Sequence, residues 1–366
     1  MRIVYVLTSL GVGGVERQVL ALDGRMAQRG HTVLLIVLVP VQQDGLRTTL
    51  DVVHLNLRKS PLRVVMGLWK GWKLLRRFHP DLVHSHNFHG NMLARLLEIT
   101  LPRAPIISTI HNVYEGGWSR MLAYRLTDRF SGCSVAVSTA AAERYIRLKA
   151  VPAAKCMVLS NAIDLAEFTA DALRRAKTRS EFEVAEEFIW FAAGRIVPAK
   201  DFPNLLRAFA SVREIHPSAQ LWITGKLSDG GTNPGIEFDS KKTNGIRWFG
   251  QRRDMPALLD AADAFVLSSA WEGMPLVVGE AMAMQKPIVA TDVGGVRELV
   301  GEFGTVVPAR DSAVSAKAML TLMATPRDER QAQGRAARGR IVSTFSFEKR
   351  MNEWKTLYDT VLQRSL

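Results

Sequence analysis

The chain of 366 residues is too long for one ordinary hydrophobic core and indicates two domains of roughly 170 residues each. With 47% hydrophobic and 23% charged residues, its composition is that of a globular protein and excludes disorder along most of the chain. The formal net charge of +13 favours an anionic partner, which leaves nucleic acid, an acidic membrane surface and a phosphorylated substrate open.

The expected compartment is the cell interior. The N-terminal sequence lacks the layout of a signal peptide, and the longest apolar run, residues 32–41, is about half the length that a bilayer span needs. Cys133 and Cys156 have no metal-ligand spacing and no partner cluster, so we expect reduced, structural thiols.

Short β-branched runs alternate with helical patterns in the first part of the chain. Strands are predicted at RIVYVLT (2–8), TVLLIVLV (32–39), DLVHSH (81–86), PIISTIH (105–111), CSVAVS (133–138) and CMVLSN (156–161). Such a rhythm is typical of a parallel α/β sheet and predicts a first domain over residues 1–165.

The rhythm resumes after a polar, helix-prone stretch, residues 166–187, which we predict to be a linker. Further strands are predicted at FIWFAAGRI (188–196), AQLWITG (219–225), IRWFG (246–250), AFVLSS (264–269) and PIVATD (287–292). This pattern predicts a second α/β domain over 188–344. Residues 345–366 have the apolar spacing of a terminal helix, which we expect to pack back toward the first domain.

A glycine loop follows the first strand, in TSLGVGGVERQV. Its glycines would allow close backbone approach to an anion at a helix N-terminus. A dinucleotide fingerprint would need glycine at position 16, which is Glu16, so nicotinamide binding is disfavoured. A plain tight turn explains the loop about as well.

Two glutamates, Glu272 and Glu280, stand eight positions apart in WEGMPLVVGEAMA. Pro275 suits the first turn of a helix, which places Glu272 in the preceding loop and Glu280 more than one turn inside. The two carboxylates could then address opposite ends of one ligand, with a diphosphate between them. The alternative is that Glu272 caps the helix and Glu280 is a solvated surface residue.

Two cations follow a predicted strand in GRIVPAKDF, where Arg195 and Lys200 stand five positions apart. Cations at a strand exit suit a pair of phosphates. Taken singly, each is more often a solvated side chain.

Taken in order, GVGGVE, LSNAID, GRIVPAKDF, EGMPLVVGEAMA and KPIVATDVGGVRELV make the chain resemble the retaining glycosyltransferases of family 4, also called group 1. The resemblance covers essentially the whole chain. It implies the GT-B fold, in which two Rossmann-like α/β domains face across a cleft. It also implies a nucleotide-sugar donor site mostly in the C-terminal domain and an acceptor site mostly in the N-terminal one.

The resemblance also implies roles for individual residues. Arg195 and Lys200 look like the diphosphate clamp, Glu280 like the acceptor of ribose hydroxyl bonds, and Glu272 like a contact to the transferred sugar. The implied catalytic residues are His111, Arg195, Lys200 and Glu272. The implied donor-binding residues are Gly14, Arg195, Lys200, Gly250, Arg252, Glu272, Gly273, Met274, Pro275, Leu276 and Glu280. The implied acceptor-side residues are Gly13, Glu16, His86 and Asn112. Asn112 departs from the histidine or aspartate that is common there, and Ala162 departs from a common glycine.

The expected chemistry follows from charge, because the departing diphosphate becomes more negative as its bond to the sugar breaks. Metal-dependent enzymes hold a cation there with an Asp-x-Asp pair, and no two aspartates of this sequence stand two positions apart. We therefore expect Arg195, Lys200 and helix N-termini to serve instead, with no metal and no cofactor. The resemblance implies front-face attack with retention, favours UDP-sugars as donors, and suggests acceptor hydroxyls on glycans or lipid-linked glycans of cell-surface polysaccharides. Glu272 is given no covalent role.

Three alternatives remain open. A nucleotide-sugar epimerase of similar fold would bind the same donor and release an isomerised sugar. A nucleic-acid-binding protein would use the positive charge, but the chain has no recognition motif for that purpose. His84, His86 and His89 could suggest zinc, although no carboxylate or cysteine completes a ligand set, and a strand-end histidine lining the cleft is the favoured interpretation.

Residues 57–80 hold seven Lys or Arg residues, two Trp and no acidic residue. Such a helix fits the interface of an anionic lipid leaflet, and we expect a cytoplasmic protein that associates peripherally with the inner face of the cell membrane. The alternative is a helix that packs on its own sheet. The apolar residues available for that packing are Val64, Val65, Leu68, Leu74 and Leu75.

Overall fold

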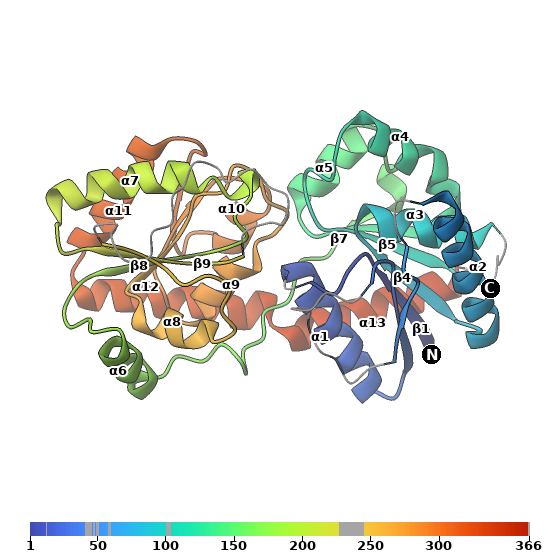
Figure 1. The fold of residues 1–366 in the computed structure, drawn as a ribbon, viewed down its shortest axis with the longest axis horizontal. Helices are drawn as coiled ribbons and strands as arrows, with labels where there is room; N and C mark the ends of the chain where they lie inside the picture. Colours follow the sequence, from blue (N-terminus) through green and yellow to red (C-terminus); the bar gives the residue numbers. More distant parts are fainter. Residues whose placement is uncertain are drawn as a thin grey trace. The chain divides into compact units, whose positions relative to one another are not determined.

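The computed structural model describes the chain except for residues 12, 41–45, 47, 49–50, 58–59, 100–103, 227–244 and 365–366. The chain divides into two compact units (Figure 1). Unit 1 comprises Met1–Asn161 and Glu348–Leu366, and unit 2 comprises Ala162–Phe347.

Unit 1 contains a sheet of seven parallel strands in the order β3-β2-β1-β4-β5-β6-β7. The strands are β1 (Arg2–Leu7), β2 (Thr32–Val37), β3 (Val52–His54), β4 (Leu82–His86), β5 (Ile106–Ile110), β6 (Cys133–Ala136) and β7 (Cys156–Val158). The α-helices are α1 (Gly14–Gln28), α2 (Pro61–Phe78), α3 (Asn87–Glu98), α4 (Trp118–Thr127), α5 (Thr139–Arg147) and most of α13 (Phe347–Gln363), and short 3-10 turns lie at Asp128–Phe130 and Ala153–Lys155.

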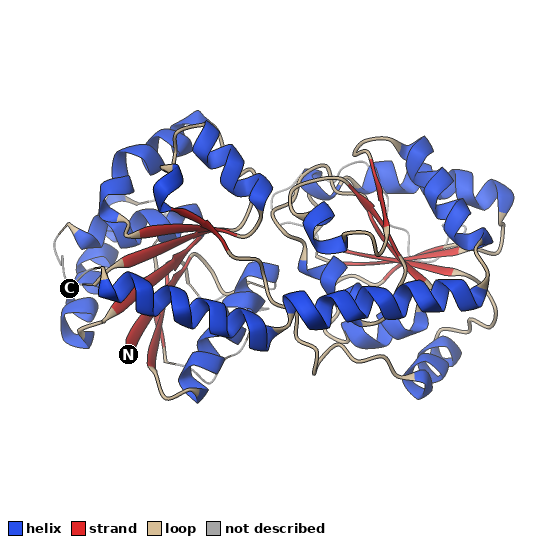
Figure 2. Cartoon of the chain, turned by 180° about the vertical axis from the view of Figure 1, so that it is seen from behind, coloured by secondary structure: helices blue, strands red, loops and turns tan. Residues whose placement is uncertain are grey.

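The core of unit 1 forms because β1 and β2 carry apolar side chains on both of their faces. Side chains of β1 and β2, such as Val4 and Ile36, pack against Leu75 of α2 and Leu93 of α3. On the opposite face lie α1 and the long helix α13 (Figure 2). There, the hydroxyl of Tyr358 on α13 lies 3.0 Å from that of Tyr5 on β1. Coverage on both faces is what a parallel sheet requires.

Unit 2 contains a sheet of six strands in the order β10-β9-β8-β11-β12-β13. The strands are β8 (Ile189–Ala193), β9 (Gln220–Thr224), β10 (Ile246–Trp248), β11 (Ala264–Leu267), β12 (Ile288–Thr291) and β13 (Thr305–Val307). The α-helices are α6 (Ala172–Glu181), α7 (Phe202–Ile215), α8 (Met255–Ala261), α9 (Leu276–Ala283), α10 (Val296–Val300), α11 (Ser312–Ala324) and α12 (Arg327–Arg340). A 3-10 turn lies at Pro198–Lys200 and a π-helical turn at Ile341–Phe345.

The two faces of the second sheet are covered by different helices. One face carries α7 and α11, and the other carries α8, α9 and α12 (Figure 1). Trp190 and Leu221, from adjacent strands, are fully buried in the core on the α7 side. The strand order reverses at β8, since β8 pairs with β9 on one side and with β11 on the other. In such sheets, ligands bind at the carboxyl ends of the strands near this reversal.

These observations confirm the predicted fold class of two Rossmann-like α/β domains. Each predicted strand is present, with ends that differ by a few residues. The prediction missed β3 and β13. Both are three-residue strands at a sheet edge, where pairing with a neighbour decides the conformation and the sequence carries little pattern.

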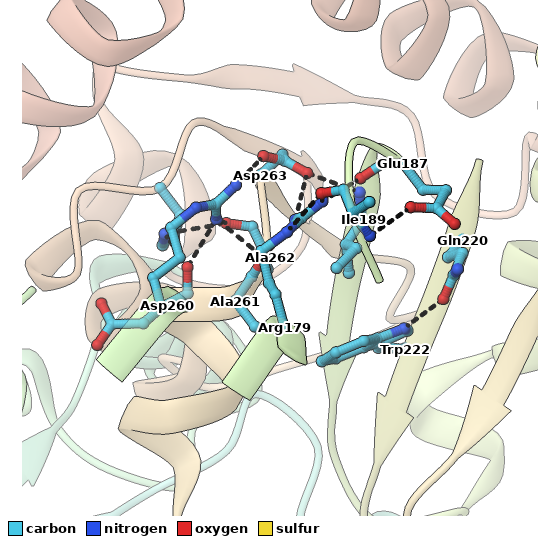
Figure 3. A network of polar contacts seen from close by, with 12 residues as sticks. Arg179, Glu187, Ile189, Gln220, Trp222, Asp260, Ala261, Ala262 and Asp263 are labelled. Atoms are coloured by element: carbon cyan, nitrogen blue, oxygen red, sulfur yellow. Dashed lines mark hydrogen bonds and ion pairs between the residues drawn. The ribbon is translucent and has the colours of Figure 1, made fainter. Parts of the chain in front are cut away.

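Residues 166–187 were expected to be a linker, and the structure corrects this because they belong to unit 2. Helix α6 packs on α8, where Arg174 pairs with the Asp260 carboxylate at 2.5 Å. Arg179 of α6 is buried and donates to main-chain oxygens of Ala261 and Glu187 (Figure 3). The polar composition therefore reflects ion pairs and carbonyl contacts within a folded unit.

The terminal helix begins at Phe347, two residues later than expected, and residues from Glu348 belong to unit 1. Both cysteines are free thiols. Among the residues described, no helix is long and apolar enough to cross a membrane.

Candidate functional site

The first cluster of predicted site residues lies at the carboxyl ends of β8 and β11 in unit 2. The amino group of Lys200 is 2.5 Å from Oε1 of Glu272, although the two residues stand far apart in the sequence. Both side chains are largely buried, with 18% and 11% of their surface exposed. This ion pair is partly desolvated and lies at the ends of two strands. A bound anion can compete with the carboxylate for the lysine there.

Three hydroxyl residues that were not predicted from the sequence support this pair. The Ser269 hydroxyl donates to Oε1 of Glu272 at 2.6 Å, and the Thr291 hydroxyl donates to the main-chain oxygen of Ser269 at 2.7 Å. The Ser268 hydroxyl donates to the main-chain oxygen of Lys200. The available signal for Ser268 and Ser269 was their place at the end of a predicted strand, four and three residues before the loop glutamate.

The loop from Gly273 to Pro275 is locked against the glycine pair that follows β12. The N–H of Gly295 donates to the oxygen of Gly273 at 2.6 Å. Gly294 has φ of 54°, and a Cβ there would lie 2.2 Å from the oxygen of Glu272. Only glycine fits this position, so Gly294 determines where Glu272 sits.

The structure decides between the interpretations of the two glutamates. Glu272 does not cap α9, whose N-cap residue is Pro275 without a side-chain cap. Glu280 lies inside α9 and is only 4% exposed, so the surface alternative is wrong. Met274 and Pro275 are also buried, whereas Leu276 is half-buried at the start of the helix.

The other residues of unit 2 that were predicted to bind the donor lie on separate loops. Arg195 is exposed directly after β8. Gly250 follows β10 with φ of 61°, and its oxygen accepts from the hydroxyl of Thr224 at 2.7 Å. Arg252 forms a two-bond pair with Asp254 in the next turn. The Asp254 partner holds the Arg252 guanidinium in the turn that was expected to bind the nucleotide base.

In unit 1, the glycine loop and Glu16 form one small cluster at the start of α1. Gly13 is the N-cap residue in an extended conformation, and Gly14 begins the helix. A Cβ on Gly13 would lie 2.3 Å from Oε2 of Glu16, so the missing side chain makes room for this carboxylate. The Ser9 hydroxyl donates to the other carboxylate oxygen at 3.2 Å.

His86 and His111 come together at the ends of the adjacent parallel strands β4 and β5. Nδ1 of His86 lies 3.0 Å from Nε2 of His111, and both side chains are buried. Burial lowers the pKa of His111 to about 3. The neighbouring Asn112 turns its side-chain oxygen to the N–H of Tyr114. Both histidines were predicted site residues, whereas the contact between their imidazoles follows only from the pairing of β4 with β5.

A network of buried side chains surrounds this pair. His84 is bonded at both ring nitrogens, to the Tyr358 hydroxyl and to the Thr109 hydroxyl, each at 2.7 Å. These bonds occupy both positions at which His84 would bind a metal. Oε1 of Glu115 accepts from the main-chain N–H of His111, and burial raises the pKa of Glu115 to about 7. In the part of the chain that is described, no three His, Cys, Asp or Glu side chains form a group that could hold a metal ion.

A cavity of about 880 Å³ lies at the opposite, amino-terminal edge of the unit 2 sheet. It is lined by the residues that precede β8, β11 and β12, including Phe188 and Pro287. Two of its half-buried cations bond to a main-chain oxygen, since Arg175 and Lys286 both donate to the oxygen of Ala262. These contacts hold α6 and α8 in place. The predicted catalytic residues of unit 2 lie at the other edge of the sheet.

Two family models together match most of the chain. The model described as "Glycosyltransferase Family 4" matches residues 12–167, and the model "Glycosyl transferases group 1" matches residues 187–325. The first lies in unit 1 apart from its last residues, and the second lies within unit 2.

Individual proteins are similar to this chain over most of its length. A glycogen synthase of Mycobacterium tuberculosis is 27% identical over 92% of this chain and 88% of its own length. The UDP-Gal:alpha-D-GlcNAc-diphosphoundecaprenol alpha-1,3-galactosyltransferase of Escherichia coli is 26% identical over 82% of this chain and 80% of its own. The structure of Anabaena HepE in complex with UDP and glucose superimposes with a TM-score of 0.84 at 20% identity, covering 98% of this chain and 99% of that one. The chain therefore belongs to the group 1, family 4 glycosyltransferases of the GT-B fold.

Proposed function

We propose that this enzyme transfers a sugar from a nucleotide-diphospho-sugar, with UDP-sugars favoured, to a hydroxyl of a glycan or a lipid-linked acceptor. Transfer retains the anomeric configuration and belongs to cell-surface polysaccharide synthesis. The observation that carries the proposal is the ion pair of Lys200 and Glu272 at the carboxyl edge of the unit 2 sheet.

The pair suits a donor that is anionic at one end and carries hydroxyl groups at the other. When a diphosphate binds, Lys200 exchanges its carboxylate partner for phosphoryl oxygens, and Glu272 becomes available to accept hydrogen bonds from sugar hydroxyls. Arg195, exposed beside this loop, supplies a second positive charge. Glu280, buried in α9, serves the ribose end of the donor, and Gly250 with Arg252 serves the base.

The names of similar proteins support the donor and acceptor classes. The Escherichia coli relative uses UDP-Gal and a diphosphoundecaprenol-linked acceptor, as its name states, and the HepE structure contains UDP and glucose. In unit 1, His111 would contact the donor sugar near the reacting carbon, while Gly13, Glu16, His86 and Asn112 belong to the acceptor side.

We also propose that the reaction needs no metal, because Lys200, Arg195 and the N-terminus of α9 can neutralise the leaving diphosphate. Front-face attack would let a donor phosphate oxygen take the acceptor proton, so Glu272 needs no covalent role.

The test is product analysis with purified enzyme, a panel of UDP- and GDP-sugars, and glycan or lipid-linked acceptors. We expect a new glycosidic bond with the donor's anomeric configuration, formed equally well in excess EDTA. An isomerised nucleotide sugar without transfer would instead establish the epimerase alternative. Loss of activity in EDTA that magnesium or manganese restores would disprove the metal-free mechanism.

Helix α2 has an exposed apolar stripe that could bind a membrane surface. Its apolar side chains Leu62, Val65, Met66 and Trp69 are between 61% and 69% exposed. Their spacing puts them on one stripe of the helix, and its cations include Lys73 and Arg76. We propose that this stripe lies on an anionic lipid leaflet at the inner face of the membrane, where lipid-linked acceptors are found. The basic residues Arg58 and Lys59 of the same segment lie outside the described residues.

A further inference from the structure

The imidazoles of His86 and His111 share a hydrogen bond whose direction determines what His111 offers to a ligand. Both rings are neutral near pH 7, because burial lowers the pKa of each far below its usual value. A neutral imidazole carries one hydrogen, so the pair has two hydrogens on four nitrogens. One of these hydrogens lies in the bond between Nδ1 of His86 and Nε2 of His111.

The second hydrogen must then lie on an outward-facing nitrogen. If His86 donates, the hydrogen is on Nδ1 of His111; if His111 donates, it is on Nε2 of His86. Both outward nitrogens are buried and have no hydrogen-bond partner among the described residues. A buried polar hydrogen without a partner is unfavourable, and the free protein holds such an unpaired group at this place in either arrangement.

The surroundings distinguish the two arrangements. His86 is 2% exposed and lies stacked on the ring of Tyr5, with His84 on its other flank at 4.1 Å between ring centroids. His111 is 8% exposed and is thus the less enclosed of the two residues. An unpaired N–H costs less where a ligand or water can approach it, so the hydrogen belongs on His111.

We propose that His86 is a positioning residue that donates from Nδ1 to Nε2 of His111 and thereby fixes His111 in the tautomer with its hydrogen on Nδ1. His111 then presents a donor, and not a base, to an oxygen of the bound sugar substrate. The identity of that substrate rests on the proposed function, whereas the tautomer is a property of the protein alone.

The first test is the tautomer itself, measured on the full chain with 15N-labelled histidine by two-bond 1H–15N correlation spectra. His111 is assigned by its loss in His111→Gln. We expect a protonated Nδ1 and a bare Nε2 on His111 at pH 7. A hydrogen on Nε2 of His111 would overturn the proposal, whether or not sugar transfer is ever detected.

The second test uses two amides that imitate different nitrogens of histidine. Asparagine places its amide near Nδ1 and can keep the bond to His111, whereas glutamine places its amide near Nε2 and cannot. We expect His86→Gln to mix the His111 tautomers and to lower kcat by about 10- to 100-fold, while His86→Asn keeps the tautomer and stays within about threefold of the native enzyme.

The matched control is His89→Asn, which changes an exposed histidine on α3 three positions away and should leave kcat and the His111 spectrum unchanged. If His86→Asn and His86→Gln lower kcat equally, His86 acts only through packing and the proposal is wrong. The proposal is also wrong if His86→Gln keeps the native kcat. If His86→Gln does not fold, the native spectrum and His86→Asn still decide. Absence of transfer with every donor, together with the expected spectra, would reject the proposed function and leave this inference standing.

Discussion

The amino group of Lys200 meets the carboxylate of Glu272 at 2.5 Å, and Ser269 donates to the same carboxylate oxygen. The lysine comes from the loop after β8 and the glutamate from the loop after β11, two strands that pair directly in the sheet. The two charges are thus held by the fold before any ligand arrives. Prior placement of charge is what electrostatic stabilisation of a leaving group requires.

Lys200→Ala should lower turnover on the order of 100-fold or more, because it removes a positive charge from the departing diphosphate. The measurement is kcat with the best donor found, alongside the midpoint of thermal unfolding to verify folding. Lys177→Ala, on the exposed face of α6, removes the same charge elsewhere in unit 2 and should have no effect. Unchanged turnover in a folded Lys200→Ala enzyme would contradict the clamp role.

Gly294→Ala should displace the Glu272 loop, because the new Cβ would lie 2.2 Å from a main-chain oxygen at a left-handed φ of 54°. We expect a loss of about 2 kcal/mol in the free energy of unfolding and at least a tenfold loss of kcat/KM. Gly339→Ala is the matched control, since its Cβ meets nothing within 4 Å in α12. That change should stabilise the protein by about 0.5–1 kcal/mol. Similar effects of the two substitutions would show that Gly294 does not hold the loop.

Much of the fold could be predicted from the sequence, because buried parallel strands are continuous apolar runs that need no partner to be recognised. The edge strands β3 and β13 could not, since their conformation depends on a neighbour. At the site, spacing placed Glu272 before a helix and His111 after a strand. It could not show that Lys200 reaches Glu272 or that His86 reaches His111, because these contacts depend on which strands are adjacent.

The mistaken linker has a related cause. Arg179 looks like a surface residue in a polar segment, yet it is buried and donates to the oxygens of Ala185, Glu187 and Ala261. No local pattern reveals these acceptors, because two of them lie in the loop before β8 and one lies at the end of α8. Figure 3 shows Glu187 and Ala261 beside Arg179.

Arg179→Met should therefore destabilise unit 2 by about 3–5 kcal/mol, since it leaves the buried carbonyl of Ala261, two partly buried carbonyls and the Asp263 carboxylate short of a donor. The measurement is chemical unfolding followed by tryptophan fluorescence, to which the buried Trp190 and Trp222 of this unit contribute. Lys177→Met on the same helix is the control and should change little. A loss below about 1 kcal/mol would mean that α6 is attached only loosely, as a linker would be.

Asp23 should make the stability of the protein depend on pH. Its carboxylate on α1 is fully buried, no described group bonds to either oxygen, and burial raises its pKa from 3.8 to about 7. The folded state thus keeps a proton that the unfolded state releases above about pH 4. The free energy of unfolding should fall as pH rises from about 4 to 7, by up to about 4 kcal/mol from this group, and then level off.

The substitution Asp23→Asn removes this titration. We expect the variant to unfold at a higher temperature than the native protein at pH 8 and at a similar temperature at pH 4.5. Glu143→Gln, an exposed position on α5, should show no such pH-dependent difference. If Asp23→Asn changes the unfolding temperature equally at both pH values, its effect comes from packing and not from the charge.

Helix α2 has one apolar face that packs on the sheet and a second apolar stripe that is exposed. Leu68, Leu74 and Leu75 pack on the sheet of unit 1, as the packing alternative required, but Val64 and Val65 do not, being 39% and 63% exposed. The helix thus has an inner apolar face and an outer one.

The outer face has no described acidic residue on α2, and its cations are Arg63, Lys70, Lys73, Arg76 and Arg77. Each cation near an anionic leaflet adds about 1 kcal/mol of attraction, and the buried apolar side chains add more. We expect the protein to sediment with vesicles that contain anionic lipid and not with zwitterionic vesicles, at low salt.

Changing the five cations together to Gln should abolish this binding, and Trp69→Gln should weaken it about tenfold while leaving kcat for a soluble acceptor unchanged. Trp118→Gln is the matched control, because Trp118 is a 79% exposed tryptophan on α4 of the same unit. If the five-cation variant still sediments with anionic vesicles, α2 is not the anchor. A different result would assign the stripe to a second copy of the chain: the native protein self-associates, Trp69→Gln abolishes this self-association, and neither protein binds vesicles. An apolar stripe that is covered by protein is no longer free to enter lipid.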